Sequence, residues 1–380
     1  MSRAALACAA AALSLAMGAC GGGESTPSDG GGTSSQTVAG GQILPSPRSL
    51  SVPGLGRPTR IEAFGHSYVG EPTGFRTLVA RHFGIPEAGQ TAGGGATVIG
   101  QLGDVYRQGL LRGSGRQPQL ALVMWGINDL AEHGREGLPA VQNGLISLIS
   151  RIRAAPGDTY GFADRSVRLS GSWQPRDGVT TTSADASIEI ALPPGARGRT
   201  IGFVAPASKG NGALYRFAVD GREAGRLDTR NLSPAMAANP GGGTPLIKRV
   251  QIPEQAQALR VLVSGVVGQA GFMGWHAEAA PAPLIAVARQ PRLAAYSAYA
   301  NPERVGDDGV AALNRAVDAA VAAFTDGRVV VADAEDPVGG EDAFFVADKL
   351  HLNATGHQWL ARRTIEALEA AASRLSKQAG

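Results

Sequence analysis

Apolar positions along the chain recur at two different spacings, and each spacing predicts a different kind of secondary structure. The segment at residues 60–64 and the continuous apolar run at residues 120–125 are candidates for buried strands. Apolar residues at steps of three and four over residues 138–152 predict a helix with one apolar stripe, which should end near Pro156-Gly157. Strands that alternate with helices in this way are typical of an α/β domain with a parallel sheet.

The pattern changes from Gly157 to about Pro281, where short alternating segments lie between turn residues and no helical stripe is present. This spacing predicts an antiparallel β-sandwich. Asp220-Gly221 predicts a hairpin turn between two of its strands. The clearest strand candidates are residues 188–192, 200–204, 215–219 and 260–263.

The α/β pattern resumes after the sandwich segments. We expect a strand at 284–288, a helix over 310–324, a strand at 328–332 and a final helix from about 355 to 375. Without residues 157–282, the preceding helix would run directly into the strand at 284, which is a normal connection. We therefore expect the sandwich, residues 157–282, to be inserted in one α/β domain formed by residues 57–156 and 283–380.

The N-terminus has the pattern of a bacterial export signal. Arg3 provides a positive charge, and the small-residue apolar run that follows it is too short to span a bilayer. The sequence LAMGAC that ends at Cys20 resembles a lipobox, with Met17 where leucine is usual. This resemblance implies removal of residues 1–19 and lipidation of Cys20. The alternative is an ordinary cleaved signal that leaves Cys20 as a free thiol.

The segment after the signal is rich in Gly, Ser, Thr and Pro as far as about Ser51. Residues 20–56 are therefore predicted to form the lipid anchor and a flexible linker. We expect the folded part to lie outside the cytoplasm, held to a membrane of the cell envelope. The only cysteines are Cys8 and Cys20, so the mature chain would contain no intramolecular disulfide.

Charge and aromatic content exclude one class of partner. The formal net charge is +3 at pH 7, and removal of Arg3 with the signal would lower it by one. A charge this small does not indicate a polyanionic partner, and an aromatic content of 5% argues against a stacking surface for nucleic acid. We therefore expect no nucleic acid partner.

Candidate catalytic residues follow two of the predicted strands and precede the last helix. The sequence GHSY places Ser67 at the carboxyl end of the first strand, where α/β folds form their crevices. The sequence WGIND places Asn128 at the same edge, where its amide could donate to a developing oxyanion. In DKLH, Asp348 can orient the imidazole of His351 while the other ring nitrogen serves as a base. Each segment alone would be interpreted as a turn or a helix cap.

In this order and at these positions, the segments resemble the SGNH (GDSL) hydrolase family. The resemblance covers most of the two α/β segments and implies a three-layer, flavodoxin-like parallel sheet that carries the inserted antiparallel β-sandwich domain. It implies that Ser67 is the nucleophile, His351 the base and Asp348 the acid that orients the base. The backbone N–H groups of Ser67 and Gly95 and the amide of Asn128 would form the oxyanion hole.

Two positions depart from the family pattern. His66 stands where the family has the aspartate of Gly-Asp-Ser, which bears on the hydrogen bonds around the nucleophile turn. A role for His66 as a second base is the less favoured alternative, since adjacent residues of an extended strand point in opposite directions. Gly95 is chosen from three consecutive glycines because it precedes the Ala-Thr that opens the next helix, and the asparagine usual upstream is absent.

The resemblance implies acyl transfer from a carboxylic ester to water, with no cofactor and no metal. We expect the substrate to be an O-acyl ester, above all an O-acetyl ester, of a polysaccharide or envelope glycan. Two alternatives stay open. One is an O-acyltransferase that uses the same serine, histidine and aspartate with a sugar acceptor. The other is a glycan-binding lipoprotein with a degenerate hydrolase domain.

The sandwich loosely resembles the carbohydrate-binding modules of extracellular hydrolases. Its aromatic residues either stack on sugar rings or belong to the core, and the core is the more frequent role in a small sandwich. These residues are Trp173, Tyr215, Phe272 and Trp275. The other histidines lack metal-ligand spacing with a carboxylate partner, so we expect structural or surface roles for them. They are His82, His133, His276 and His357.

Overall fold

The computed structural model describes residues 44–107, 118–176, 178–208, 210–230, 244–335 and 341–379. The predicted signal segment, Cys20 and most of the predicted linker lie outside the described residues, so lipidation and membrane attachment stay predictions. None of the described helices combines the length and the apolarity needed to span a bilayer.

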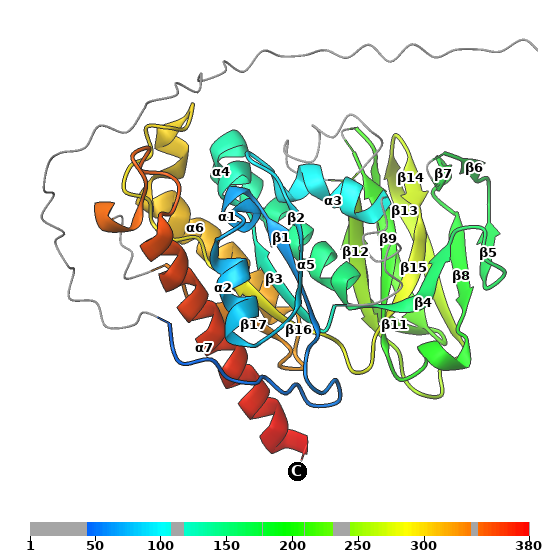
Figure 1. The fold of residues 1–380 in the computed structure, drawn as a ribbon. Helices are drawn as coiled ribbons and strands as arrows, with labels where there is room; N and C mark the ends of the chain where they lie inside the picture. The colour runs from blue at the N-terminus through cyan, green and yellow to red at the C-terminus, as the bar shows by residue number, and fades with distance from the viewer. Residues whose placement is uncertain are drawn as a thin grey trace, which may run out of the picture. The chain divides into compact units, whose positions relative to one another are not determined.

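A parallel sheet forms the centre of the α/β part (Figure 1). Its strand order is β17-β16-β3-β1-β2, and all its pairings are parallel. Taken in sequence order this is 2-1-3-4-5, the flavodoxin-like order, so the predicted fold class is confirmed. The strands are β1 (Arg60–Gly65), β2 (Glu87–Ala92), β3 (Leu120–Met124), β16 (Leu284–Ala288) and β17 (Val329–Ala332).

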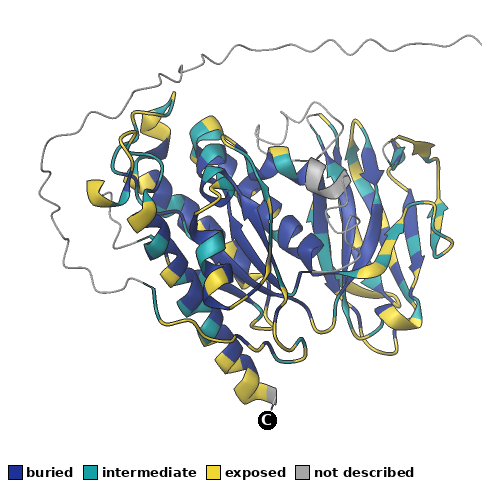
Figure 2. Ribbon diagram, viewed as in Figure 1, coloured by how far each residue is buried: buried dark blue, intermediate teal, exposed yellow. Residues whose placement is uncertain are grey.

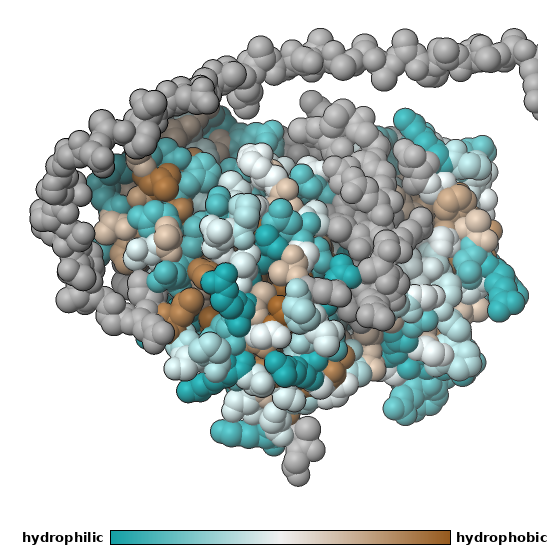
Figure 3. Space-filling model, in the orientation of Figure 1, coloured by the Kyte–Doolittle hydropathy of each residue, from teal (hydrophilic) through white to brown (hydrophobic). Residues whose placement is uncertain are grey.

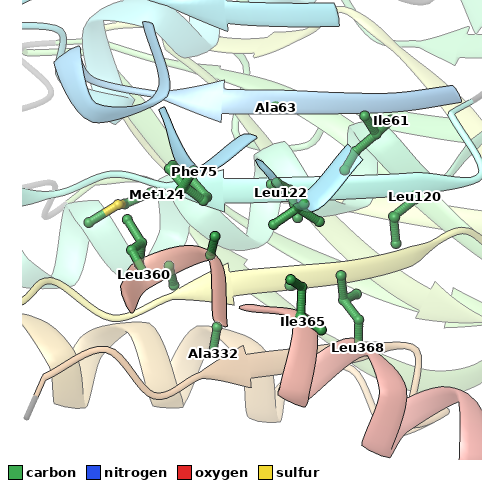
Figure 4. Close-up of a cluster of buried hydrophobic side chains, with 14 of the residues drawn as sticks. Ile61, Ala63, Phe75, Leu120, Leu122, Met124, Ala332, Leu360, Ile365 and Leu368 are labelled. Carbon is green, nitrogen blue, oxygen red and sulfur yellow. The ribbon is translucent and has the colours of Figure 1, made fainter. Parts of the chain in front are cut away.

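Helices cover both faces of this sheet. Successive side chains of its central strands point to opposite faces, and each face belongs to an apolar cluster that helices complete. In β3, Leu120 and Leu122 belong to the cluster drawn in Figure 4, and Ala121 and Val123 belong to the other cluster. The first cluster includes residues of α1 (Ser67–Gly70), α2 (Phe75–His82) and α7 (Ala354–Ala379). The second includes residues of α3 (Val98–Arg107), α4 (Ile127–His133), α5 (Leu138–Arg153) and α6 (Pro302–Ala322, broken at Gly306).

The antiparallel strands between Ala154 and Glu278 form two larger sheets and one small sheet. Their strand orders are β11-β10-β13-β8-β5, β12-β9-β15-β4 and β14-β7-β6. The strands are β4 (Ala154–Gly161), β5 (Val167–Ser170), β6 (Gln174–Pro175), β7 (Val179–Thr181), β8 (Ser187–Ala191), β9 (Thr200–Ala207), β10 (Gly212–Val219), β11 (Arg222–Asp228), β12 (Thr244–Gln251), β13 (Ala258–Val267), β14 (Ala270–Phe272) and β15 (Gly274–Glu278). Short 3-10 turns lie at η1 (Arg135–Gly137), η2 (Pro194–Ala196) and η4 (Asp342–Phe344).

Local sequence signals account for the turns of this part. Asp220 and Gly221 join β10 to β11 with φ values of 46° and 82°, as a tight hairpin requires. The prediction that the helix of residues 138–152 ends near Pro156-Gly157 was wrong by a few residues. Helix α5 ends at Arg153 and β4 begins at once, with Pro156 inside it. Proline is tolerated there because β4 is an edge strand, paired only with β15.

The sandwich aromatics are mainly core residues. Tyr215 and Phe272 are 0% exposed and Trp275 is 1% exposed, so these three side chains cannot stack on a sugar from solvent. The hypothesis of sugar stacking is therefore wrong for them. Only Trp173 is partly exposed, and its indole N–H donates to the backbone oxygen of Ser170. Figure 2 shows buried residues in the strands of both the parallel sheet and the sandwich.

Helix α5 packs against the sandwich through apolar and ionic contacts. Leu246 of β12 and Ala207 of β9 belong to the same apolar cluster as α5. Glu278 of β15, which is 2% exposed, accepts from Arg153 of α5 at 2.7 Å and from Arg249 of β12 at 2.5 Å. Arg153 also pairs with Asp326 at 2.6 Å. This buried ion cluster therefore joins the end of α5 to two sandwich strands.

Candidate active site

Ser67 lies at the carboxyl end of β1, where α1 begins. A Cβ on Gly65 would lie 2.5 Å from the backbone oxygen of Met124, so only glycine fits where the two strands end side by side. His66 is the N-cap of α1, and its Nδ1 accepts from the backbone N–H of Tyr68. The chain therefore turns sharply into α1 and leaves Ser67 half-buried at the sheet edge.

The structure brings Ser67, His351 and Asp348 into one chain of hydrogen bonds. The Ser67 Oγ lies 3.0 Å from His351 Nε2, and His351 Nδ1 lies 2.7 Å from Asp348 Oδ2. This is the geometry in which a carboxylate orients an imidazole so that its other nitrogen can take the serine proton. Serine and histidine are 284 residues apart in sequence, so only the fold could bring them together.

The loop that carries Asp348 and His351 is fixed by its own hydrogen bonds. Asp348 Oδ1 accepts from the backbone N–H groups of Leu350 and His351, each at 2.8 Å. Partial burial alone would raise the pKa of Asp348, but hydrogen bonds from the His351 ring and from this backbone hold it below its usual value. The Tyr68 hydroxyl donates to the backbone oxygen of Leu350 at 2.5 Å, which ties the loop to α1.

Asn128 and Gly95 lie where two loops meet at the ends of β2 and β3. Asn128 is in the first turn of α4, and its Nδ2 donates to the backbone oxygen of Ala96 at 2.9 Å. Gly95 has φ of +69° in the loop between β2 and α3. The backbone N–H of Gly93 donates to the oxygen of Gly65 at 3.4 Å, which ties this loop to β1 beside Ser67. The roles of Asn128 and Gly95 toward an oxyanion stay predictions.

Asp129 is a site residue that the sequence analysis did not identify. Its side chain is 0% exposed, and its carboxylate accepts from the backbone N–H groups of Val98 and Ile99 at 2.9 and 3.4 Å. Burial raises the pKa of Asp129 to about 7 despite these hydrogen bonds. Asp129 thus caps α3, while its neighbour Asn128 holds Ala96. The Asn-Asp pair alone predicts a turn or a helix cap, but nothing local in the sequence shows that the capped helix is α3.

His66 does not act on the Ser67 hydroxyl in this structure. Its Nε2 lies 3.2 Å from Gln290 Oε1, and its Nδ1 accepts from Tyr68, so both ring nitrogens have other partners. Burial lowers the pKa of His66 to about 4, which keeps it neutral at pH 7. With Nδ1 as an acceptor, the proton must lie on Nε2, facing Gln290. His66, at the position of the aspartate in Gly-Asp-Ser, therefore stabilises the turn before Ser67 through its hydrogen bonds with Tyr68 and Gln290.

The remaining histidines have structural surroundings. His82 lies 3.5 Å from Glu369, and His276 is fully buried with its Nε2 3.2 Å from the Ser150 hydroxyl. His357 accepts from the backbone N–H of Phe75 at the start of α2. Within the described ranges, no group of three or more His, Cys, Asp or Glu side chains is arranged to hold a metal ion.

Comparison with known proteins finds similar solved structures only. No protein-family model matches the sequence, and no curated protein matches it either. A carbohydrate esterase of family 3 from Talaromyces cellulolyticus is 11% identical over 83% of this chain and 99% of its own, with a TM-score of 0.40. A lipolytic protein of the G-D-S-L family from Veillonella parvula is 10% identical over 81% and 96%, with a TM-score of 0.37.

Other similar solved structures cover a smaller share of this chain. The CBM36-1 domain of a multidomain xylanase from the hindgut metagenome of Trinervitermes trinervoides is 11% identical over 32% of this chain and 95% of its own, with a TM-score of 0.25. All these TM-scores are below 0.5. The similar structures nevertheless include both kinds of protein that the sequence motifs resemble, a GDSL protein and a carbohydrate-binding module.

Proposed function

We propose that this chain is a serine esterase that hydrolyses carboxylic esters. The observation that carries the proposal is the hydrogen-bonded chain from Ser67 Oγ through His351 to Asp348. A serine hydroxyl is almost fully protonated at neutral pH, so it needs a base within hydrogen-bond reach to attack a carbonyl. His351 Nε2 satisfies this requirement at 3.0 Å.

In the first half of the proposed reaction, Ser67 Oγ bonds to the carbonyl carbon of the ester and its proton passes to His351 Nε2. Asp348 stabilises the resulting imidazolium. The carbonyl oxygen becomes an oxyanion, for which the backbone N–H groups of Ser67 and Gly95 and the amide of Asn128 are the proposed donors. When the carbon–oxygen bond to the alcohol breaks, His351 returns the proton to the leaving alkoxide.

In the second half, water attacks the acyl-serine. His351 accepts a proton from the water, a second oxyanion forms, and the bond from the acyl carbon to Ser67 Oγ breaks. The carboxylic acid leaves and Ser67 regains its proton from His351. No electron transfer occurs and no cofactor is needed, because both halves exchange only acyl groups and protons.

The finer part of the proposal concerns substrate and location. We propose that the substrate is a short-chain ester, O-acetyl above all, of a polysaccharide or envelope glycan, and that Cys20 anchors the enzyme outside the cytoplasm. Polar side chains in the lining of the pocket beside Ser67, among them Thr73, Asn353 and Gln358, support the choice of a glycan. Anchoring rests on the sequence before residue 44, and loss of palmitate labelling in a Cys20→Ala variant would test it.

The primary experiment compares wild type with Ser67→Ala on p-nitrophenyl acetate. We expect turnover to disappear while the melting temperature stays the same, since the hydroxyl has a solvent-accessible position and its main partner is His351. Turnover that survives in Ser67→Ala would refute the assignment of the nucleophile.

Two further readouts separate the alternatives. A fluorophosphonate probe should label wild type at Ser67, whereas an inert serine would favour a binding protein with a degenerate hydrolase domain. Product analysis with and without a sugar acceptor distinguishes hydrolysis from transfer, because a transferase forms a new sugar ester at the expense of free acid.

A further inference from the structure

A pocket of about 640 Å³ opens beside the proposed nucleophile. Ser67, Asp348 and His351 form one part of its wall, and residues of the α1–α2 turn and of the first turns of α7 form the rest. The volume falls in the range of roughly 300–1,000 Å³ that is usual for sites of small molecules. The pocket is therefore large enough for a group of the substrate that lies next to the scissile bond.

Glu71 provides a hydrogen-bond acceptor in this pocket. It follows α1 directly, and its backbone oxygen accepts from the N–H of Gly74 at 3.1 Å, which fixes the turn that leads into α2. Thr77 adds a hydrogen bond to the oxygen of Pro72 at 2.7 Å. The Glu71 carboxylate forms no hydrogen bond or ion pair with another described residue. An ionised carboxylate accepts hydrogen bonds but does not donate them.

His357 provides a donor in the same pocket. It is in α7 and is 6% exposed, and its Nδ1 accepts from the backbone N–H of Phe75 at 3.4 Å. Helix α2 has no side-chain cap from Gly74, so the His357 ring supplies that acceptor. Burial lowers the pKa of His357, which keeps the ring neutral at pH 7. In a neutral ring whose Nδ1 accepts, Nε2 carries the proton and can donate.

The charge of the pocket is negative. Two carboxylates, Glu71 and Asp348, line it, and no lysine or arginine occurs among the described residues of its lining. Both side chains are exposed, so their repulsion of another anion is partly screened by water and weakens as salt is added. An anionic substrate, such as a uronate, a sulfated sugar or a phospholipid, would therefore bind poorly beside Ser67.

The lining also has an apolar part. It includes Leu78, Val346 and Leu352, which suit the C–H face of a sugar ring. Val346 is 42% exposed, and only Leu262 and Val267 are comparable large hydrophobic residues in the described ranges. On the face shown in Figure 3, hydrophobic groups are small and separated by hydrophilic residues. Among the described residues, Val346 is thus the one strongly exposed large hydrophobic side chain in the lining, whereas a lipid interface has a broad apolar surface.

We propose that this pocket holds the alcohol part of the ester and that it selects a neutral polyhydroxylated alcohol such as a sugar unit. Glu71 accepts hydrogen bonds from hydroxyl groups of the alcohol, and His357 donates to one of their oxygens. Hydroxyl groups both donate and accept, so they satisfy both side chains at once. This inference rests on the proposed role of Ser67 as nucleophile, because that role places the alcohol next to the pocket.

The test uses Glu71→Gln, which keeps the size of the side chain and removes its charge. The value of kcat/KM should fall about tenfold more for 6-O-acetylglucose than for p-nitrophenyl acetate, since a hydrogen bond to a charged acceptor is lost only with the polyol. Glu136→Gln is the matched control, because Glu136 is exposed in η1 and is not in the pocket lining. It should leave both values unchanged. His357 is a poorer target, because its loss would also uncap α2.

Two outcomes would overturn the inference: an equal loss of kcat/KM for both substrates in Glu71→Gln, or no loss for either. Glu71→Lys should shift the preference toward an O-acetylated glucuronate relative to 6-O-acetylglucose, and an unshifted preference would also count against it. A binding measurement separates the subsite from the chemistry. In a Ser67→Ala background, adding Glu71→Gln should weaken the binding of 6-O-acetylglucose about tenfold in an NMR titration. If Ser67 were not the nucleophile, the kinetic difference between the two substrates would disappear, whereas the weaker binding in the NMR titration would remain.

Discussion

Replacing Asp348 with asparagine tests the proposed catalytic geometry most directly. In the wild type, Asp348 Oδ1 accepts from two backbone N–H groups at 2.8 Å, and Oδ2 accepts from His351 Nδ1 at 2.7 Å. Asparagine has one acceptor oxygen, and the two backbone donors would hold it at the Oδ1 position. Its NH₂ group would then face Nδ1, which must become an acceptor. The ring proton would move to Nε2, so His351 could no longer take the proton of Ser67.

The expected loss is large and has a known precedent. The same substitution in a serine protease lowers kcat by about 10⁴-fold through the wrong tautomer, equivalent to about 5.5 kcal/mol of transition-state stabilisation. We expect a similar fall in kcat for p-nitrophenyl acetate at neutral pH, with an unchanged melting temperature. Asp333→Asn is the control, because Asp333 also follows a strand of the sheet but is 64% exposed and pairs with Arg289. A kcat for Asp348→Asn within tenfold of the wild type would show that His351 does not depend on this carboxylate.

Three other predictions follow from the site and the core. Asn128→Ala should lower kcat by about 10²–10³-fold in the same ester assay and leave measurable turnover, because one oxyanion donor is lost. Burial lowers the pKa of His276 to about 3 from 6.5, so the stability that the neutral ring contributes is complete above pH 6.5 and decreases as the pH falls. Urea unfolding of His276→Leu should therefore show a shallower decline of the free energy of unfolding below pH 6.5, by up to about 1.4 kcal/mol per pH unit. Glu278→Gln should lower that free energy by about 3–5 kcal/mol, because two arginines lose a buried anion. Glu366→Gln, at an exposed ion pair, should change it by less than about 1 kcal/mol.

Some of the fold could be predicted because the apolar pattern is local and strong. The runs at β3 and β16 are buried at every residue, as expected for central strands of a covered parallel sheet. The stripe of α5 was equally clear, but its end was not. Pro156 predicts a helix stop, yet the backbone changes to a strand three residues earlier, and pairing with β15 makes that conformation favourable.

The candidate site was predictable where its residues follow strand ends or are neighbours in sequence. Asp348 and His351 are three residues apart, and Ser67 lies two residues after the end of a strand. The contacts that orient the site are long-range and have no local signal. His66 meets Gln290 across 224 residues, and Asp129 caps a helix that begins 31 residues before it. Burial is the main cause of the shifted pKa values of His66 and Asp129, and the extent of burial is known only once the chain is folded.

The buried ion cluster has a consequence for how the protein unfolds. Arg153 belongs to the α/β part, whereas Glu278 and Arg249 belong to the sandwich, and each is buried or nearly buried against the other part. Opening this junction would break the buried ion pair between Arg153 and Glu278 and would uncover the side of α5 that Leu246 covers. Neither part can melt first without a large loss of free energy in the other. Scanning calorimetry of the protein should therefore show one cooperative transition, and a sandwich cut out between Ala154 and Glu278 should leave a poorly soluble remainder.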